Sequence, residues 1–105
     1  QMAIVDTPLS IERRETALSD GMMLRAAAPI LDDEGNLLGV LYGGVLINRN
    51  YAIVDKIKQT VYENLTYDDK DIGTATIFQD DVRVSTNVRN QDGSRALGTR
   101  VSEEV

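Results

Sequence analysis

The chain has 105 residues, contains no cysteine, histidine or tryptophan, and carries a formal net charge of -6. These absences exclude disulfide frameworks, thiolate and imidazole catalysis, and metal or haem sites that depend on Cys or His ligands. The acidic balance disfavours nucleic acid and anionic membranes as partners, because their phosphates would be repelled.

The first predicted element is a short helix over residues 7–20. Thr7 is suited to the N-cap, Pro8 to the first helical position, and Gly21 to the position just past the end. The apolar residues of this stretch form only a loose face, so the capping signals carry the prediction.

Two apolar runs, at 22–31 and 37–48, follow this segment. The sequence Asp32-Asp33-Glu34-Gly35-Asn36 between them favours a turn, because short polar side chains bond to nearby backbone and glycine accepts a positive φ. Three glycines in the second run disfavour a helix there. We therefore predict an antiparallel hairpin over residues 22–48.

Residues 50–66 change to a helical period. Apolar residues recur every four positions with charged residues on the other side, which is typical of an amphipathic helix; the stripe comprises Ile53, Ile57, Val61 and Leu65. Asn48 or Asn50 is suited to cap this helix. The polar sequence at 67–73 is predicted to be a connector.

The last predicted elements are two short β-branched segments within residues 74–88, joined by Asp80-Asp81 as a second hairpin. Another turn is expected at 90–94. Ser102 and the two acids after it resemble a helix N-terminus, so we expect the chain to be an excerpt from the middle of a longer protein.

These elements predict an α+β fold within one domain spanning residues 1–105. Its antiparallel sheet would have about four to five strands with flanking helices, and the helix at 50–66 would cover the apolar face of the sheet.

Two stretches resemble the Cache family, the PAS-like extracytoplasmic sensor modules of bacterial chemoreceptors and sensor histidine kinases. The stretch from Gly73 to Val88, with R-V-S-T-N-V at 83–88, continues through D-G-S-R-A-L-G-T-R at 92–100. It resembles the opening strands of a membrane-proximal Cache module.

The second stretch contains Ala27-Ala28-Pro29-Ile30, Gly35 and the run from Leu38 to Val45, and it resembles the closing hairpin of a Cache module. The closing pattern therefore precedes the opening pattern, as it would in the middle of a double Cache receptor. Two outcomes remain open: one sheet in permuted order, or half-modules swapped with another copy.

The resemblance implies a pocket for a small ligand, often a carboxylate or amino acid. A carboxylate requires a desolvated cation, and an arginine fork is best suited to it. Arg25 and Arg83 are candidates because each interrupts a predicted strand. Tyr42 beside Gly43, and Thr86 at a strand end, are candidate hydroxyl donors. For each of these residues a purely structural role is the competing interpretation.

The acidic clusters do not predict a metal site. The sequence from Asp32 to Asn36 lacks the alternating spacing and distal glutamate of an EF-hand loop, and turns account for it and for 90–93. We expect neither a catalytic residue nor a cofactor.

The predicted function is that of a periplasmic sensor domain in a bacterial inner-membrane receptor, either a sensor histidine kinase or a chemotaxis receptor. Its partners would be a small-molecule ligand, such as a carboxylate or amino acid, and a second copy in a homodimer, with no nucleic acid. The alternative is a structural dimerisation module that binds no ligand. A small carboxylate-dependent hydrolase is a third interpretation, disfavoured by the absent His and Cys. A transmembrane segment after Val105 is expected if the receptor interpretation is correct.

Overall fold

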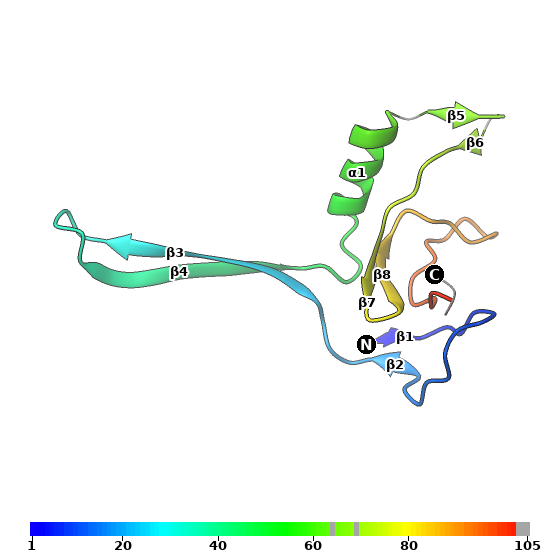
Figure 1. Cartoon of the computed structure of the whole chain (residues 1–105), viewed down its shortest axis with the longest axis horizontal. Coiled ribbons are helices and arrows are strands. Elements are labelled where there is room, and N and C mark those ends of the chain that lie inside the picture. Colours follow the sequence, from blue (N-terminus) through cyan, green and yellow to red (C-terminus); the bar gives the residue numbers. More distant parts are fainter. Residues whose placement is uncertain (64, 69, 103–105) are drawn as a thin grey trace.

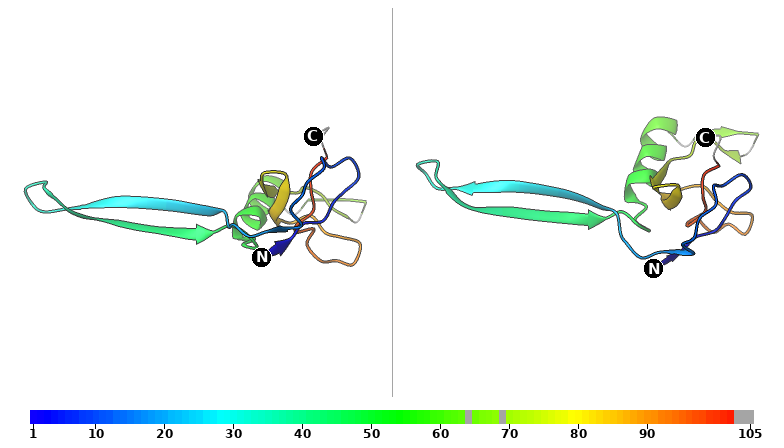
Figure 2. Two further views of the ribbon diagram at one scale, coloured as in Figure 1. Left: turned by 90° about the horizontal axis from the view of Figure 1, so that it is seen from below. Right: turned by 60° about the horizontal axis from the view of Figure 1, so that its bottom comes forward.

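A long two-stranded arm projects from a folded body in the computed structural model of the chain (Figure 1). The structure describes residues 1–63, 65–68 and 70–102. The extents are 60 × 39 × 24 Å and the radius of gyration is 18.5 Å, against roughly 13 Å for a compact chain of this length. The elongation comes from the arm, which two further views also show extending away from the body (Figure 2).

The arm is the hairpin predicted over residues 22–48. It pairs β3 (Met23–Leu31) with β4 (Leu37–Leu46) in antiparallel register. The turn forms as the sequence indicates: the Asp32 carboxylate accepts backbone N–H bonds from Glu34 at 3.0 Å and Asn36 at 2.8 Å, and Gly35 takes a φ of 85°. Every residue of β3 is exposed, and nearly every residue of β4.

The helix α1 (Ala52–Tyr62) confirms the helical period but is shorter than predicted. Glu63 adopts a left-handed conformation with φ 48° and ends the helix. The Asn50 side chain accepts the N–H of Ala52 at 3.2 Å, immediately before the first turn. Val54 is fully buried, whereas Ile57 and Val61 are exposed. The helix therefore buries mainly its first turn against the body. The prediction that it covers the apolar face of a sheet is wrong.

The body is built on the second predicted hairpin, which pairs β7 (Thr76–Gln79) with β8 (Val82–Thr86). The turn residue Asp80 has a φ of 58°. The core gathers around β8, where Val82 and Val84 have no exposed surface, and it comprises Met2, Leu18, Ile47, Val82 and Val84. The predicted turn at 90–94 is also present, closed by the Asn90 N–H donating to the Ser94 carbonyl at 2.8 Å.

The helix predicted over residues 7–20 is wrong. This segment is irregular, with a turn at residues 8–9, and near its end β2 (Ala17–Leu18) pairs with β1 (Met2–Ala3), which precedes the segment. The Thr7 hydroxyl, expected to cap the helix, instead donates to the Arg100 carbonyl at 2.7 Å. Leu9 has a φ of 66°, which a helix does not permit. Hydrogen bonds to residues near the C-terminal end therefore take the place of the local hydrogen bonds of a helix.

Arg100 anchors this N-terminal segment to the body. Its side chain is 3% exposed and forms ion pairs with Asp6 at 2.9 Å and Asp81 at 2.6 Å. Arg13 reaches the other oxygen of Asp81 at 2.9 Å. Burial opposes ionisation of Asp81, but the hydrogen bonds and charges of Arg100 and Arg13 outweigh it and lower the pKa of Asp81. The network joins the chain's first residues to the β7–β8 turn.

The strands do not form the single sheet that was predicted. The described strands form four separate two-stranded ladders. One of them pairs β5 (Thr66–Tyr67) with β6 (Lys70–Asp71), from the last residue of the predicted helix into the predicted connector. The architecture remains antiparallel strands with one helix. The helix start expected after Ser102 falls on residues 103–105, outside the described residues.

Candidate functional site

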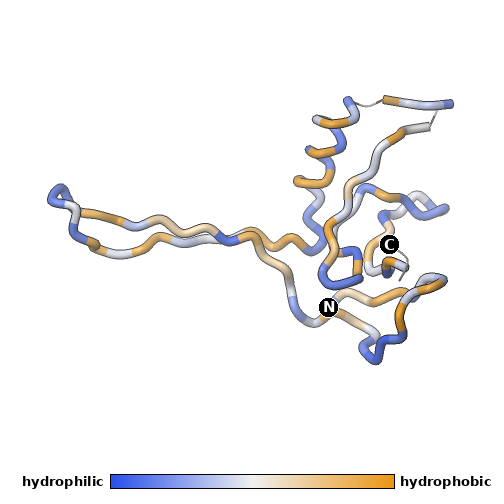
Figure 3. Tube along the Cα trace, viewed as in Figure 1, coloured by the Kyte–Doolittle hydropathy of each residue, from blue (hydrophilic) through white to orange (hydrophobic). Residues whose placement is uncertain are grey.

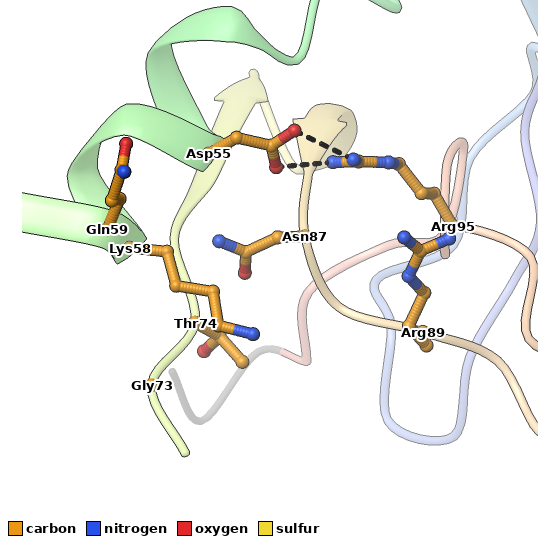
Figure 4. A pocket seen from close by; sticks show the side chains of 8 residues that line it. All are labelled: Asp55, Lys58, Gln59, Gly73, Thr74, Asn87, Arg89 and Arg95. Carbon is orange, nitrogen blue, oxygen red and sulfur yellow. Dashed lines mark hydrogen bonds and ion pairs between the residues drawn. The ribbon is translucent and has the colours of Figure 1, made fainter. Parts of the chain in front are cut away.

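A polar hollow of about 550 Å³ lies between α1 and the ends of β7 and β8 (Figure 4). The helix contributes one wall, the segment before β7 another, and the residues after β8 the third. The lining residues are Asp55, Lys58, Gln59, Gly73, Thr74, Asn87, Arg89 and Arg95.

Arg95 holds two walls of the hollow together. Its guanidinium donates to both carboxylate oxygens of Asp55 on α1, each at 2.8 Å. The same group donates to the Thr86 carbonyl at the end of β8, also at 2.8 Å, and its centre lies 4.0 Å from the ring centroid of Tyr51. The hydrogen bond from Arg95 lowers the pKa of Asp55, so the pair is ionised at neutral pH.

Asn87 fixes the floor of the hollow. Its side-chain oxygen accepts the N–H of Ala75 at 2.8 Å, and its amide donates to the Val54 carbonyl of α1 at 3.2 Å. One side chain therefore joins the helix to both strands. Its partners Ala75 and Val54 lie 12 and 33 positions away in the chain.

A structured turn presents the third cation, Arg89. Its guanidinium donates to the Gly93 carbonyl at 3.0 Å. The turn needs Gly93, whose φ is 84°, and Asp92 accepts both the backbone N–H and the hydroxyl of Ser94 at 2.9 and 2.6 Å. These bonds hold the turn while leaving Arg89 exposed at the rim of the hollow.

Gly73 brings the chain close to α1 on the remaining side. A Cβ atom at this position would overlap the ring of Tyr62, and φ is 89°. Any other residue would be strained here on both counts. The glycine therefore sets how closely this wall approaches the helix.

The hollow is locally cationic in an acidic chain. Lys58, Arg89 and Arg95 face one carboxylate, that of Asp55, whereas the whole chain carries -6. Charge-assisted hydrogen bonds from such cations suit a carboxylate or another small anion. The described residues include no cluster of His, Cys, Asp or Glu placed to hold a metal ion.

The structure places the four predicted site residues in two separate pairs. Arg25 and Tyr42 lie on the arm, where the guanidinium carbon stands 5.6 Å from the ring centroid. Both are exposed, and neither lines the polar hollow.

The other pair lies on β8. Arg83 donates to the Thr99 hydroxyl at 2.8 Å and stacks 5.3 Å from the centroid of the Phe78 ring. Among the described residues, its Nε is the buried side-chain polar atom without a hydrogen-bond partner. Thr86 is fully buried and shares a 2.7 Å hydrogen bond with the Thr76 hydroxyl. Thr86 supports the hollow from behind through the carbonyl that Arg95 binds.

Sequence reasoning missed the residues that do gather. Asp55, Lys58 and Gln59 share one face of α1, being three and four positions apart. Arg89 and Arg95 flank the Asp92-Gly93 turn, whose bonding draws them together in a bridge between their backbones. The sequence does contain a signal for this site. It is the spacing of charged residues on the polar side of the helix and at the two ends of one turn.

Within the described ranges, no helix has the length and apolarity that crossing a bilayer requires.

Residues 45–105 match the family model described as single Cache domain 3, which is more than half of the chain. The chain belongs to this Cache family, whose domains are sensor modules of signalling receptors. No curated protein and no solved structure matches the sequence.

The matched residues cover some elements of the molecule and not others. The hollow, α1 and the β7–β8 hairpin all lie inside it, whereas β3 and most of β4 precede it. The resemblance of residues 73–102 to the Cache family is confirmed, and their interpretation as the opening strands of a membrane-proximal module stays a prediction. The interpretation of 27–45 as the closing hairpin of another module stays a prediction.

Proposed function

We propose that the chain is the ligand-sensing part of an extracytoplasmic receptor region and that it binds a small carboxylate in the hollow beside α1. The supporting observation is that the hollow is lined by three cations and one carboxylate, that of Asp55. Its walls are joined by the hydrogen bonds of Asn87 and Arg95. The parent protein would be a bacterial sensor histidine kinase or chemotaxis receptor in the inner membrane, with this region in the periplasm. The chain itself would be a binding module without a catalytic role.

The way a ligand would signal follows from the walls it touches. α1 is held to the body by Val54, by Asn87 and by the Asp55–Arg95 pair, while Ile57 and Val61 in its later turns are exposed. An anion bound between Lys58 and Arg89 would draw the helix toward the 90–94 turn. A ligand shifts a two-state equilibrium only by its difference in affinity for the two states, so the bound anion would favour the drawn-in position of α1.

The direct test is calorimetric titration with a panel of mono-, di- and tricarboxylates, amino acids and inorganic phosphate. We expect at least one carboxylate to bind, and Arg89→Gln to weaken it about 10-fold by removing one charge-assisted bond. Arg25→Gln is the matched control, because it removes an exposed arginine from the arm. Equal weakening by both substitutions would point to general charge attraction.

The reverse pattern, with loss only in Arg25→Gln, would place the ligand on the arm, where Arg25 and Tyr42 lie. Absence of binding by every anion would overturn the sensing proposal. The alternative is then a structural dimerisation module, which the exposed apolar strands of the arm favour.

A further inference from the structure

Apolar residues occur along both strands of the arm (Figure 3), and their side chains are exposed. Alternation along the strands divides these side chains into two faces. We name one the uncharged face: it has no charged or polar side chain and comprises Leu24, Ala26, Ala28, Ile30, Gly39, Leu41, Gly43 and Val45. The opposite face carries Arg25 stacked on Tyr42.

The accessible surface of the chain exceeds that of a folded monomer. It measures 7982 Å², whereas a monomer of this mass exposes about 5,800 Å². The surplus of about 2,100 Å² is more than the roughly 800 Å² per partner that a standard interface buries. The arm accounts for this surplus, because nearly every residue of its two strands is exposed.

The uncharged face combines a hollow with a projecting side chain. Small residues in its middle leave a shallow hollow of about 390 Å³, and a Cβ at Gly43 would meet no atom within 4 Å. The hollow is lined by Ala26, Ala28, Leu41 and Gly43 of this face, and by Ala27 and Tyr42 of the opposite face. Leu41, 67% exposed, stands beside this hollow as a projection. A projection next to a hollow on one surface is complementary to a second copy related by a twofold axis.

Charge selects the orientation of two such copies. The tip of the arm carries Asp32, Asp33 and Glu34, and each chain has a net charge of -6. A parallel arrangement would place two acidic tips together, whereas an antiparallel one separates them along the length of the arm.

We propose that the uncharged face is an interface between two copies of this chain. The two arms pack face to face and antiparallel about a twofold axis, with Leu41 of each copy seated in the hollow beside Gly43 of the other. The apolar face is thereby removed from water without any change in the β3–β4 pairing. This interface is independent of the proposed ligand site, which lies on the body.

Sedimentation equilibrium of the whole chain over micromolar concentrations tests this packing. We expect twice the monomer mass for the unsubstituted chain. Leu41→Glu places a carboxylate in the interface and is expected to weaken dimerisation about 100-fold or more. Val40→Glu is the matched control: this neighbour is 55% exposed but lies on the opposite face, so its dimer should persist. Far-UV circular dichroism checks that each variant is folded.

Gly43→Leu distinguishes specific packing from nonspecific hydrophobic association. It adds apolar area to the face but fills the hollow, so we expect dimerisation to weaken about 10-fold, as overpacking predicts. A dimer that tightens with Gly43→Leu overturns the proposed packing. A chain that is monomeric at every concentration, that forms larger open assemblies, or that responds equally to Leu41→Glu and Val40→Glu overturns it as well.

Discussion

The body and the arm contain similar strands in opposite surroundings. In the body, β8 buries Val82 and Val84 completely and binds its neighbours through Ser85 and Thr86. In the arm, β4 is twice as long as β8 yet its apolar side chains remain exposed. A complete ladder of backbone pairs is thus no evidence of a core, because a hairpin alone buries little apolar surface.

The largest expected effect concerns the anchor of the body. Arg100→Met removes the cation that Asp6 and Asp81 share and leaves a partly buried carboxylate with one partner fewer. We expect the melting temperature to fall by on the order of 15 °C. Calorimetry measures it, with Arg49→Met as the control, since the side chain of Arg49 is exposed and its guanidinium makes a long 3.5 Å bond to the Gln1 carbonyl. A fall of the same size in the control would contradict the anchoring role.

Two valines compare the regions directly. Val84→Ala in β8 removes methyl groups from a fully buried site, whereas Val40→Ala changes a side chain that is 55% exposed on the arm. We expect losses of about 2 kcal/mol and less than about 0.5 kcal/mol in the free energy of unfolding. Urea denaturation of both variants measures this. Similar losses would mean that the arm has a buried environment of its own.

A smaller effect is expected at the pair that joins α1 to the body. Arg95→Lys keeps the charge but loses the two-pronged bond to Asp55 and the bond to the Thr86 carbonyl. Hydrogen exchange of α1 should accelerate about 10-fold, which corresponds to 1.4 kcal/mol of opening free energy. Exchange in β8 serves as the internal control, and an unchanged α1 would show that Val54 and Asn87 alone hold the helix.

Acid is expected to destabilise the body modestly. The folded pKa values of Asp55 and Asp81 are both lowered, so their stabilisation is complete above the unfolded value near 4 and is lost as pH falls through the folded values. Urea midpoints should therefore be flat from pH 7 to pH 5 and fall below pH 4. In Asp81→Asn the urea midpoint should be lower at neutral pH and should fall less steeply as the pH decreases. An unchanged slope would mean that another group causes the acid sensitivity.

Local signals in the sequence predicted the local structure well. Turn residues gave both hairpins, with Gly35 and the Asp80-Asp81 pair at their ends, and the four-residue spacing gave α1. The helix predicted over 7–20 failed because its capping residue, Thr7, bonds to Arg100, 93 positions away. No local pattern reports such a bond.

The candidate site was predictable in kind but not in position. Arginine was the expected side chain for an anion, yet interruption of a strand selected Arg25 and Arg83, which lie on the arm and against Phe78. The hollow instead depends on the bridge between the segments around Arg89 and Arg95 and on the approach of α1. These contacts join three elements, so residue type alone does not locate them.

Hydrogen exchange read by mass spectrometry at two protein concentrations tests the contrast between body and arm most directly. The account predicts that protection of β7 and β8 is the same in dilute and concentrated samples, because the body buries its own core. Protection of β3 and β4 should increase with concentration as two arms pack together. Arm protection that does not change on dilution, or body protection that is lost on dilution, would contradict the account.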